Sequence, residues 1–320
     1  MTQYVIRRLL QSLVLLVGIT MLTFAIMQLT PGGPMRLMID PNIDPAQIEK
    51  AEQRLGLDRP VIVQYFSWLG EVARGNLGYC IKNGRPVLEV IMERVPATIY
   101  LTGLAFVLSF AAAIPLGVLS ATRRYSLLDY TMTVVSFAGI SIPAFFFGLL
   151  LIFLFSIKLG WLPTSGLATI GADLRGWALL ADRLKHVIMP ALVLALPNMA
   201  TVMRYTRSSM LEVLGQEYVQ TARAKGLSER VVVYRHALRN AMIPVITIFG
   251  LSLPFLFGGA FITETVFAWP GMGRLGIESV FAREYPVVMG INLFTSTLVL
   301  VGNLIADVLY AIVDPRIRYS

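Results

Sequence analysis

The chain has 320 residues, of which 56% are hydrophobic and only 14% are charged, and its formal net charge at pH 7 is +8. Soluble domains are close to half apolar and a quarter charged. This balance, with a mean hydropathy of +0.69, therefore excludes a soluble globular domain and indicates a protein that lies mostly in the bilayer. A single cysteine, Cys80, excludes an intrachain disulfide framework. With only two histidines, a zinc site made by this chain alone is not expected.

Six segments are apolar over the length of about 20 residues that a spanning helix needs. They are, approximately, residues 9–29, 98–121, 131–155, 187–204, 241–263 and 287–312. The fourth contains Pro190 and Pro197, which membrane helices tolerate where neighbouring groups satisfy the freed carbonyls. The first is too long for a cleaved signal peptide and lacks a small-residue cleavage site. The sequence therefore predicts an all-α integral membrane protein with six transmembrane helices in a single domain, residues 1–320.

The long loop between the first two spans, residues 30–97, is predicted to contain helices. Three segments carry helix signals: residues 44–56, about 61–74 and about 86–95. In the first, Asp44 is suited to cap the helix, Pro45 to its first position and Gln47 to the third position after the cap. The other two carry apolar side chains at helical spacing. We expect all three helices to lie on the outer membrane surface, where they either cap the bundle or contact an external partner.

The distribution of Lys and Arg over the loops predicts the orientation, because cytoplasmic loops are enriched in these residues. One side carries 13 of the 27 cations and only five acids. These cations are Arg7, Arg8, Arg123, Arg124, Arg204, Arg207, Arg223, Lys225, Arg230, Arg235, Arg239, Arg316 and Arg318. Both termini and the loop 205–240 are therefore predicted to be cytoplasmic. Topology and anionic membrane lipid explain the basic excess, so no nucleic-acid partner is invoked.

The cytoplasmic loop continues as QEYVQTARAKGLSERVVVYRHALRNAMIP over residues 216–244. A helix over 217–225 is predicted to end at Gly226, since glycine best adopts the left-handed conformation past a helix end. Ser228 is predicted to cap a second helix that starts near Glu229. A folded hairpin is not needed merely to connect two spans, so this loop is predicted to be a docking device.

This stretch resembles the signature loop of ABC importer permeases, whose usual pattern is Glu-Ala-Ala, three residues and Gly. The matching residues are QTA at 220–222, RAK at 223–225 and Gly226, and the Ile-x-Leu-Pro that usually ends the pattern is HALR at 236–239. The wording TARAKGL followed by RHALRNA is typical of the di- and oligopeptide (and nickel) permeases. Further matches cover nearly the whole chain: GLDRPVIVQYFSWL at 56–69, GNLGY at 75–79, ERVPAT at 93–98, GWLPTSG at 160–166 and ETVFAWPGMGRL at 264–275.

The resemblance implies the type I ABC importer permease fold and a bacterial or archaeal inner-membrane location. The chain would form half of the pathway for di- or oligopeptides in an ATP-driven importer, with nickel chelate or glutathione as open alternatives. The implied partners are a homologous second permease, two cytoplasmic ABC ATPases and an extracytoplasmic solute-binding protein. The helix over 217–225 would enter a groove on the ATPase, with small residues allowing close approach. The residues assigned to this coupling are Glu217, Gln220, Thr221, Ala222, Arg223, Ala224, Lys225 and Gly226.

Several enzyme motifs are absent from the sequence. It has no G-x-x-x-x-G-K-[ST] phosphate-binding loop, so ATP and Mg are expected on partner ATPases and no cofactor is expected in this chain. It also has no G-x-S-x-G elbow and no H-E-x-x-H. The chain is therefore not predicted to be an enzyme.

Polar residues inside the apolar segments are candidates for the lining of a translocation pathway, because polar groups in hydrocarbon usually face the protein interior or a wet cavity. The candidates are Asn198, Asn292, Asn303 and Asp307. Helix packing is the alternative, and it is the simpler interpretation for Asp307, near the cytoplasmic end, and for Asn198 beside Pro197. A self-contained secondary transporter or channel is the main alternative of another class. It would be expected to show internal repeats or midplane charges, and the sequence shows neither convincingly.

The outer segment 264–286 follows the fifth span and carries Glu264, Trp269, Gly271 and Gly273. A tryptophan at this depth is commonly an interface anchor. The resemblance adds a second interpretation, a contact or gate element near the outer entrance of the pathway.

Overall fold

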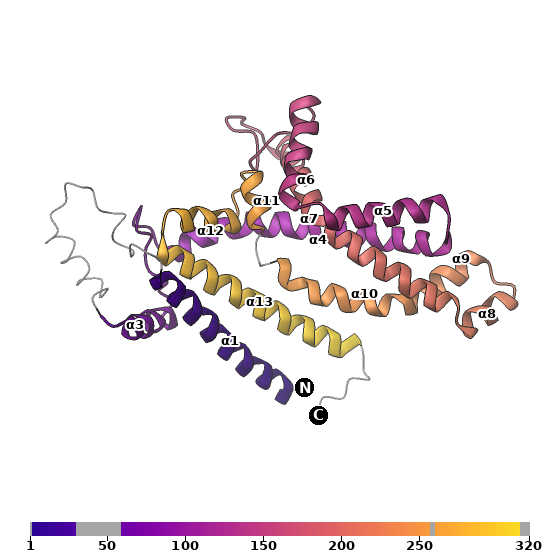
Figure 1. Cartoon of the computed structure of the whole chain (residues 1–320), viewed down its shortest axis with the longest axis horizontal. Coiled ribbons are helices and arrows are strands. Elements are labelled where there is room, and N and C mark those ends of the chain that lie inside the picture. Colours follow the sequence, from indigo (N-terminus) through magenta and orange to yellow (C-terminus); the bar gives the residue numbers. More distant parts are fainter. Residues whose placement is uncertain (1, 30–58, 257–259, 314–320) are drawn as a thin grey trace.

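A computed structural model describes residues 2–29, 59–256 and 260–313, and within these ranges the structure is helical apart from turns and one isolated bridge between Tyr79 and Pro86 (Figure 1). The first half comprises α1 (Thr2–Leu29), α3 (Val61–Ala73), α4 (Val87–Thr122), α5 (Leu127–Ser141), α6 (Ala144–Leu151) and the π-helical η1 (Ile152–Lys158). The second half comprises α7 (Gly176–Leu214), α8 (Glu217–Ala224), α9 (Glu229–Val231), the π-helical η2 (Val232–Ala237), α10 (Leu238–Ser252), η3 (Leu253–Leu256), α11 (Phe261–Val266), α12 (Met272–Phe281) and α13 (Tyr285–Val313).

Within the described residues, five helical stretches are long and apolar enough to cross a membrane, and a sixth span results if a bent pair of helices is counted as one. The five stretches are Ile6–Leu29, Val87–Thr122, Gly176–Leu214, Glu229–Leu256 and Tyr285–Asp307. They lie over five of the six segments that the sequence predicts. The all-α, multi-span architecture is therefore confirmed.

The third predicted span, residues 131–155, is not one straight helix. The helix over Leu127–Ser141 and the helix over Ala144–Lys158 meet at an angle of 108°. Pro143 precedes the first residue of α6, and Ile142 before it is extended, with φ −79° and ψ 124°. A residue that precedes proline is disfavoured in the α conformation, so the chain turns here. Figure 1 shows α6 leaving the direction of α5 and projecting from the bundle.

The centre of the bundle is the parallel pair α4 and α7, which pack along each other through small and medium apolar residues. Leu101, Val187 and Ala191 are fully buried in this contact, and Ala105 and Ala195 are nearly so. Small residues allow spanning helices to approach closely. Around this pair lie α5, α10 and α13, and α1 lies beside α13 (Figure 1).

The predicted helices of the first outer loop have three different outcomes. The helix predicted over 61–74 is present as α3, and the Tyr65 hydroxyl is hydrogen-bonded to that of Thr20 in α1 at 3.0 Å. The segment 44–56 lies outside the described residues. The prediction of a separate surface helix over 86–95 is wrong, because this segment is the start of α4. Its apolar side chains are buried against α13 and not turned to a membrane surface: Val87 and Ile91 pack with Val287 and Ile291.

Candidate functional site

The candidate coupling loop lies at the end of the molecule opposite α3 and α12 (Figure 1). Its first helix is α8, with Glu217 in the first turn, where a carboxylate is favourable beside the positive end of the helix dipole. Lys225 follows the helix, and Gly226 has φ +77°, the left-handed conformation that the sequence predicts. The Gly226 amide donates a hydrogen bond to the Arg223 carbonyl at 2.9 Å and closes the turn.

The second arm of the loop starts at Glu229, as predicted, but Ser228 caps it differently. The Ser228 side chain makes no capping hydrogen bond, and its carbonyl instead accepts one from the Val232 amide at 3.0 Å. From Val232 the arm continues as η2 and then, without a break, as the spanning helix α10. The coupling loop is therefore joined directly to a span on this side.

The inner face of α8 packs on the second arm and on the end of α7. Val219 and Val232 are fully buried and Ala222 is nearly so, with Val213 and Leu214 packed around them. Ala222 therefore holds the hairpin together, and the expectation that it provides close approach for a partner is wrong. The other residues assigned to coupling are exposed: Glu217, Gln220, Thr221, Arg223, Ala224, Lys225 and Gly226.

Arg223 is held within the loop. Its Nε lies 2.7 Å from Glu229 Oε1, so the guanidinium bridges the two arms across the turn. A second bridge joins the Tyr218 hydroxyl to the Asn240 side chain at 2.6 Å. Both contacts stiffen the hairpin, which a device that passes on a displacement requires.

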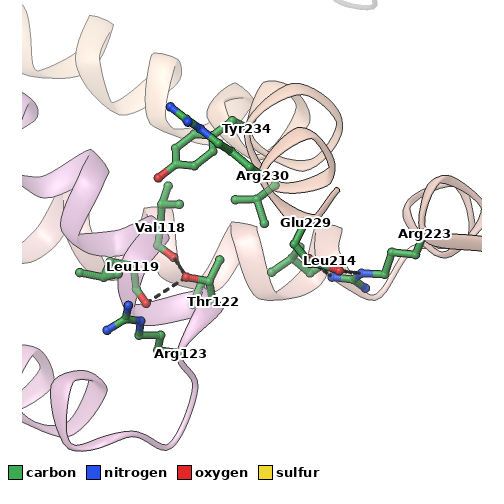
Figure 2. A pocket seen from close by; sticks show the side chains of 11 residues that line it. Val118, Leu119, Thr122, Arg123, Leu214, Arg223, Glu229, Arg230 and Tyr234 are labelled. Carbon is green, nitrogen blue, oxygen red and sulfur yellow. Dashed lines mark hydrogen bonds and ion pairs between the residues drawn. The ribbon is translucent and has the colours of Figure 1, made fainter. Parts of the chain in front are cut away.

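A cavity of about 380 Å³ lies between the end of α4 and the second arm of this loop (Figure 2). Val118, Leu119 and Leu214 contribute apolar side chains to it, while Arg123 on one side and Arg230 with Tyr234 on the other provide polar groups. The full lining is Val118, Leu119, Ala121, Thr122, Arg123, Leu214, Arg223, Glu229, Arg230, Val233 and Tyr234. The hollow thus forms part of the exposed surface of the coupling loop.

The four candidate pathway residues are not gathered in one place. The Asn292 side chain donates a hydrogen bond to the Thr23 hydroxyl, and Asp307 Oδ2 lies 3.2 Å from Arg8 Nε. Both contacts join α13 to α1, so these two residues serve helix packing. Asn198 and Asn303 are exposed, and neither side chain forms a hydrogen bond within the part of the chain that the structure describes.

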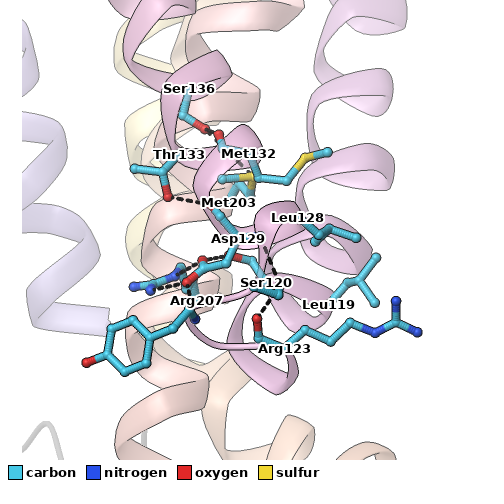
Figure 3. Close-up of polar contacts among 12 residues, drawn as sticks. Leu119, Ser120, Arg123, Leu128, Asp129, Met132, Thr133, Ser136, Met203 and Arg207 are labelled. Carbon is cyan, nitrogen blue, oxygen red and sulfur yellow. Dashed lines mark hydrogen bonds and ion pairs between the residues drawn. The ribbon is translucent and has the colours of Figure 1, made fainter.

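A buried ion pair near the end of α7 was not predicted from the sequence, in which its two residues stand out only as charges of the predicted cytoplasmic side. Asp129, at the start of α5, is 3% exposed, and its carboxylate receives Nε and Nη2 of Arg207 at 2.7 and 2.8 Å (Figure 3). A bidentate arginine–carboxylate pair fixes geometry as well as charge. The position of Asp129 beside an apolar segment was a signal for such a pair, because a carboxylate that is buried there needs a basic partner.

The segment after α10 forms a buried cluster around Glu264. Trp269 is fully buried and its indole N–H donates a hydrogen bond to the Ala97 carbonyl at 2.8 Å, so its interpretation as an interface anchor is wrong. Glu264 is also fully buried and accepts hydrogen bonds from the Thr98 hydroxyl and the Arg274 amide, both at 2.9 Å. The segment therefore fastens the part of α4 around Ala97 and Thr98.

Comparison with known proteins identifies relatives over the whole length. The family of binding-protein-dependent transport system inner membrane components matches residues 113–319, and the N-terminal family of the same transport membrane components matches residues 1–102. The oligopeptide transport system permease protein AppB of Bacillus subtilis (strain 168) is 50% identical over 320 residues, which cover all of both chains. The dipeptide transport system permease protein DppB of Escherichia coli (strain K12) is 40% identical over 338 aligned positions, again covering all of both.

Solved structures give a matching fold. A chain of the MetNI methionine ABC transporter, in an inward-facing conformation, superposes with a TM-score of 0.55 at 20% identity, covering 71% of this chain and 97% of that one. At this identity the likeness carries the fold alone, which is that of type I ABC importer permeases.

Proposed function

The chain belongs to the family of binding-protein-dependent transport system inner membrane components, and we propose that it is the peptide-carrying permease subunit of an ATP-driven ABC importer. Two relatives of full length, at 50% and 40% identity, are named for oligopeptide and dipeptide transport. The observation that carries the proposal is the stiff, exposed hairpin of α8 and α9, which continues directly into two spanning helices.

In this proposal the hairpin receives an ATPase subunit. Two such subunits bind ATP and Mg, and this chain binds neither. The groups available for contact are the exposed side chains of α8 and the turn after it, chiefly Glu217, Gln220, Thr221 and Lys225. Ala222 and Arg223 support them from within, by packing and by the pair with Glu229.

The hairpin converts movement of the ATPase into movement of spans because both its ends are helical. The first arm follows α7 after only Gly215 and Gln216, whose amides donate hydrogen bonds to Glu212 and Val213 carbonyls at 3.3 and 3.1 Å. The second arm is continuous with α10 through η2. A displacement of α8 therefore tilts α7 and α10 together, and this would open or close a pathway beside them.

We place half of the pathway on this chain and the other half on a homologous second permease. The exposed amides of Asn198 in α7 and Asn303 in α13 support this, because an amide left without a partner in hydrocarbon costs on the order of a few kcal/mol. Contact with the second permease or with a wet cavity would satisfy both. The other two polar candidates are already used in contacts with α1.

The orientation proposed has both chain ends and the hairpin in the cytoplasm. Figure 1 shows the start of α1 and the end of α13 directed toward the side of α8 and α9, with α3 and α12 at the opposite end. Trp161, shortly after η1, and Trp177, in the first turn of α7, are both exposed. This orientation places them at the outer membrane interface, where exposed tryptophan is favourable. An extracytoplasmic solute-binding protein would deliver the peptide there.

Reconstitution tests the proposal. The chain is assembled in proteoliposomes with its second permease, both ATPases and its binding protein, and uptake of radiolabelled dialanine and tetraalanine is measured with ATP inside. We expect uptake of at least one peptide that requires ATP and every subunit. Exclusive uptake of nickel chelate or glutathione would overturn the peptide assignment. ATP-independent uptake by the isolated chain would overturn the importer and establish a self-contained channel or secondary transporter.

A further inference from the structure

We propose that Asp129 is a positioning residue that fastens α4, α5 and α7 into one unit with the coupling loop, so that a displacement of α8 reaches three helices together. This inference rests on the proposed role of α8 as the receiver of ATPase movement. It concerns a cluster that none of the coupling or pathway assignments includes.

The Asp129 carboxylate joins three separate segments of the chain (Figure 3). Its Oδ1 accepts hydrogen bonds from the Ser120 hydroxyl of α4 at 2.5 Å and from Arg207 Nε of α7 at 2.7 Å. Its Oδ2 accepts from Arg207 Nη2 at 2.8 Å and from the Tyr125 amide in the α4–α5 turn at 3.1 Å. Four directional contacts thus define where α5 begins relative to both neighbours.

The backbones of α4 and α7 also lie close together at this place. A Cβ atom added to Gly117 would lie 2.6 Å from Thr206 Cβ and 2.8 Å from the Met203 carbonyl oxygen. Gly117 is three residues before Ser120, and Thr206 is adjacent to Arg207. The two helices are therefore in backbone contact beside the carboxylate, and sliding one along the other would break the hydrogen bonds.

The connection from this cluster to the coupling loop is short and stiff. Arg207 lies seven residues before Leu214, the last residue of α7, which is about 10 Å along a helix. Val213 and Leu214 then pack directly on Val219 of α8. A movement of α8 therefore passes through two turns of helix before it meets the carboxylate.

The turn between α4 and α5 shows that the cluster constrains the backbone. Tyr125 has φ +61°, a left-handed conformation that is uncommon for a bulky residue. It persists where the surroundings determine it, and here its amide is directed at Asp129 Oδ2. Apolar packing alone would hold the helices together but would not fix the turn in this direction.

The test uses the complete reconstituted transporter and measures two rates in the same proteoliposomes: ATP hydrolysis and uptake of whichever of dialanine and tetraalanine the wild type carries. In D129N an NH₂ group replaces one of the two acceptor oxygens, so it faces at least one of the donors Ser120, Tyr125 and Arg207 and cannot accept a hydrogen bond from it. R207K keeps the charge but loses the bidentate contact, and S120A removes one donor only. We expect each to raise the number of ATP molecules hydrolysed per peptide, by about tenfold for D129N and less for the other two, within the range by which single residues change coupling.

The matched control is D307N. It breaks a second ion pair between helices, Arg8 with Asp307, that lies away from α7 and α8. We expect its ratio of ATP to peptide to equal the wild type's.

The outcomes separate the possible errors. If assembled R207K and S120A keep the wild-type ratio of ATP to peptide, the positioning role is excluded. This holds even if D129N does not assemble. It also holds if hydrolysis and uptake both fall in proportion, because the ratio is then unchanged. If the wild type shows no ATP-dependent uptake of either peptide, the proposed function fails instead, and a ratio that rises equally in D307N would also overturn the inference.

Discussion

The Thr98 hydroxyl donates a hydrogen bond to the fully buried Glu264 carboxylate at 2.9 Å, across 166 positions of sequence. The same hydroxyl accepts one from the Met272 amide at 2.8 Å. Thr98 thus joins α4 to two points of the segment that follows α10. The Glu264 carboxylate needs open space around it to reach Thr98. Gly271 and Gly273 provide that space, because a Cβ on either would meet the carboxylate.

We expect Gly271→Ala to destabilise the protein by about 1–3 kcal/mol, the usual cost of overfilling a packed site. The added methyl group would overlap the Glu264 carboxylate and separate it from Thr98. Thermal unfolding in detergent measures the change. Gly70→Ala is the control, since no atom lies within 4 Å of its added methyl group and alanine favours the helix. Equal melting temperatures for both variants would contradict the role given to Gly271.

Gly226→Val is expected to disfavour the turn after α8 by roughly 1–2 kcal/mol, because a side chain at φ +77° clashes with its own backbone. Transport and peptide-stimulated ATP hydrolysis should fall while membrane insertion persists. Gly226→Asn should retain more activity, as asparagine tolerates this conformation.

Gly215→Ala is the control in the same loop. Gly215 has φ −83°, and its added methyl group would lie at an ordinary 3.5 Å from the Glu212 carbonyl. Stimulated hydrolysis unchanged in Gly226→Val, with the complex intact, would remove Gly226 from the coupling mechanism.

The orientation can be tested with single cysteines. Ser67 on α3 and Ser228 in the hairpin are both exposed. In intact cells an impermeant maleimide should label Ser67→Cys and leave Ser228→Cys unlabelled until the membrane is opened. The reverse pattern would invert the topology and remove the hairpin from the cytoplasm.

Native Cys80 should not be labelled by the maleimide and need not be replaced. Its thiol is 5% exposed, and burial raises its pKa above the usual range, with the nearby Glu284 carboxylate adding to the shift. Since only the thiolate reacts, we expect no labelling of the wild type at pH 7 and labelling after denaturation. Rapid labelling of the native protein would contradict the burial of Cys80.

Asp307→Asn should change little. The ion pair with Arg8 is partly exposed, with side-chain exposures of 46% for Arg8 and 27% for Asp307. Exposed pairs contribute about 1 kcal/mol or less, so we expect a small loss of stability and normal peptide uptake. A variant that folds but no longer transports peptide would indicate that Asp307 lines the pathway.

The sequence predicted the helical spans and the turn at Gly226 because these depend on local properties. Apolar length defines a span, and glycine is the residue that tolerates a left-handed turn. The bend before Pro143 was harder to foresee, since proline in a membrane helix often leaves it unbroken, as Pro96 does in α4.

Contacts between distant positions could not be predicted. Asp129 and Arg207 are 78 positions apart, and Asn292 and Thr23 are 269 apart. Charge counting placed the first two on the same side of the membrane, but no periodicity in one sequence shows which helices are neighbours. The start of α4 was misassigned for the same reason, because its apolar face is covered by a helix near the other end of the chain.

The pairing of α1 with α13 has a consequence for biogenesis. Helix α1 contacts α13, at the other end of the described residues, through Arg8 with Asp307 and Thr23 with Asn292. At about 5–20 residues per second, the ribosome needs on the order of tens of seconds to produce α13 after α1 has entered the membrane. During that interval α1 lacks its contacts with α13 and must be kept by lipid or by the insertion machinery. A nascent chain stopped before residue 285 would therefore hold α1 in the membrane without the helix that it packs against.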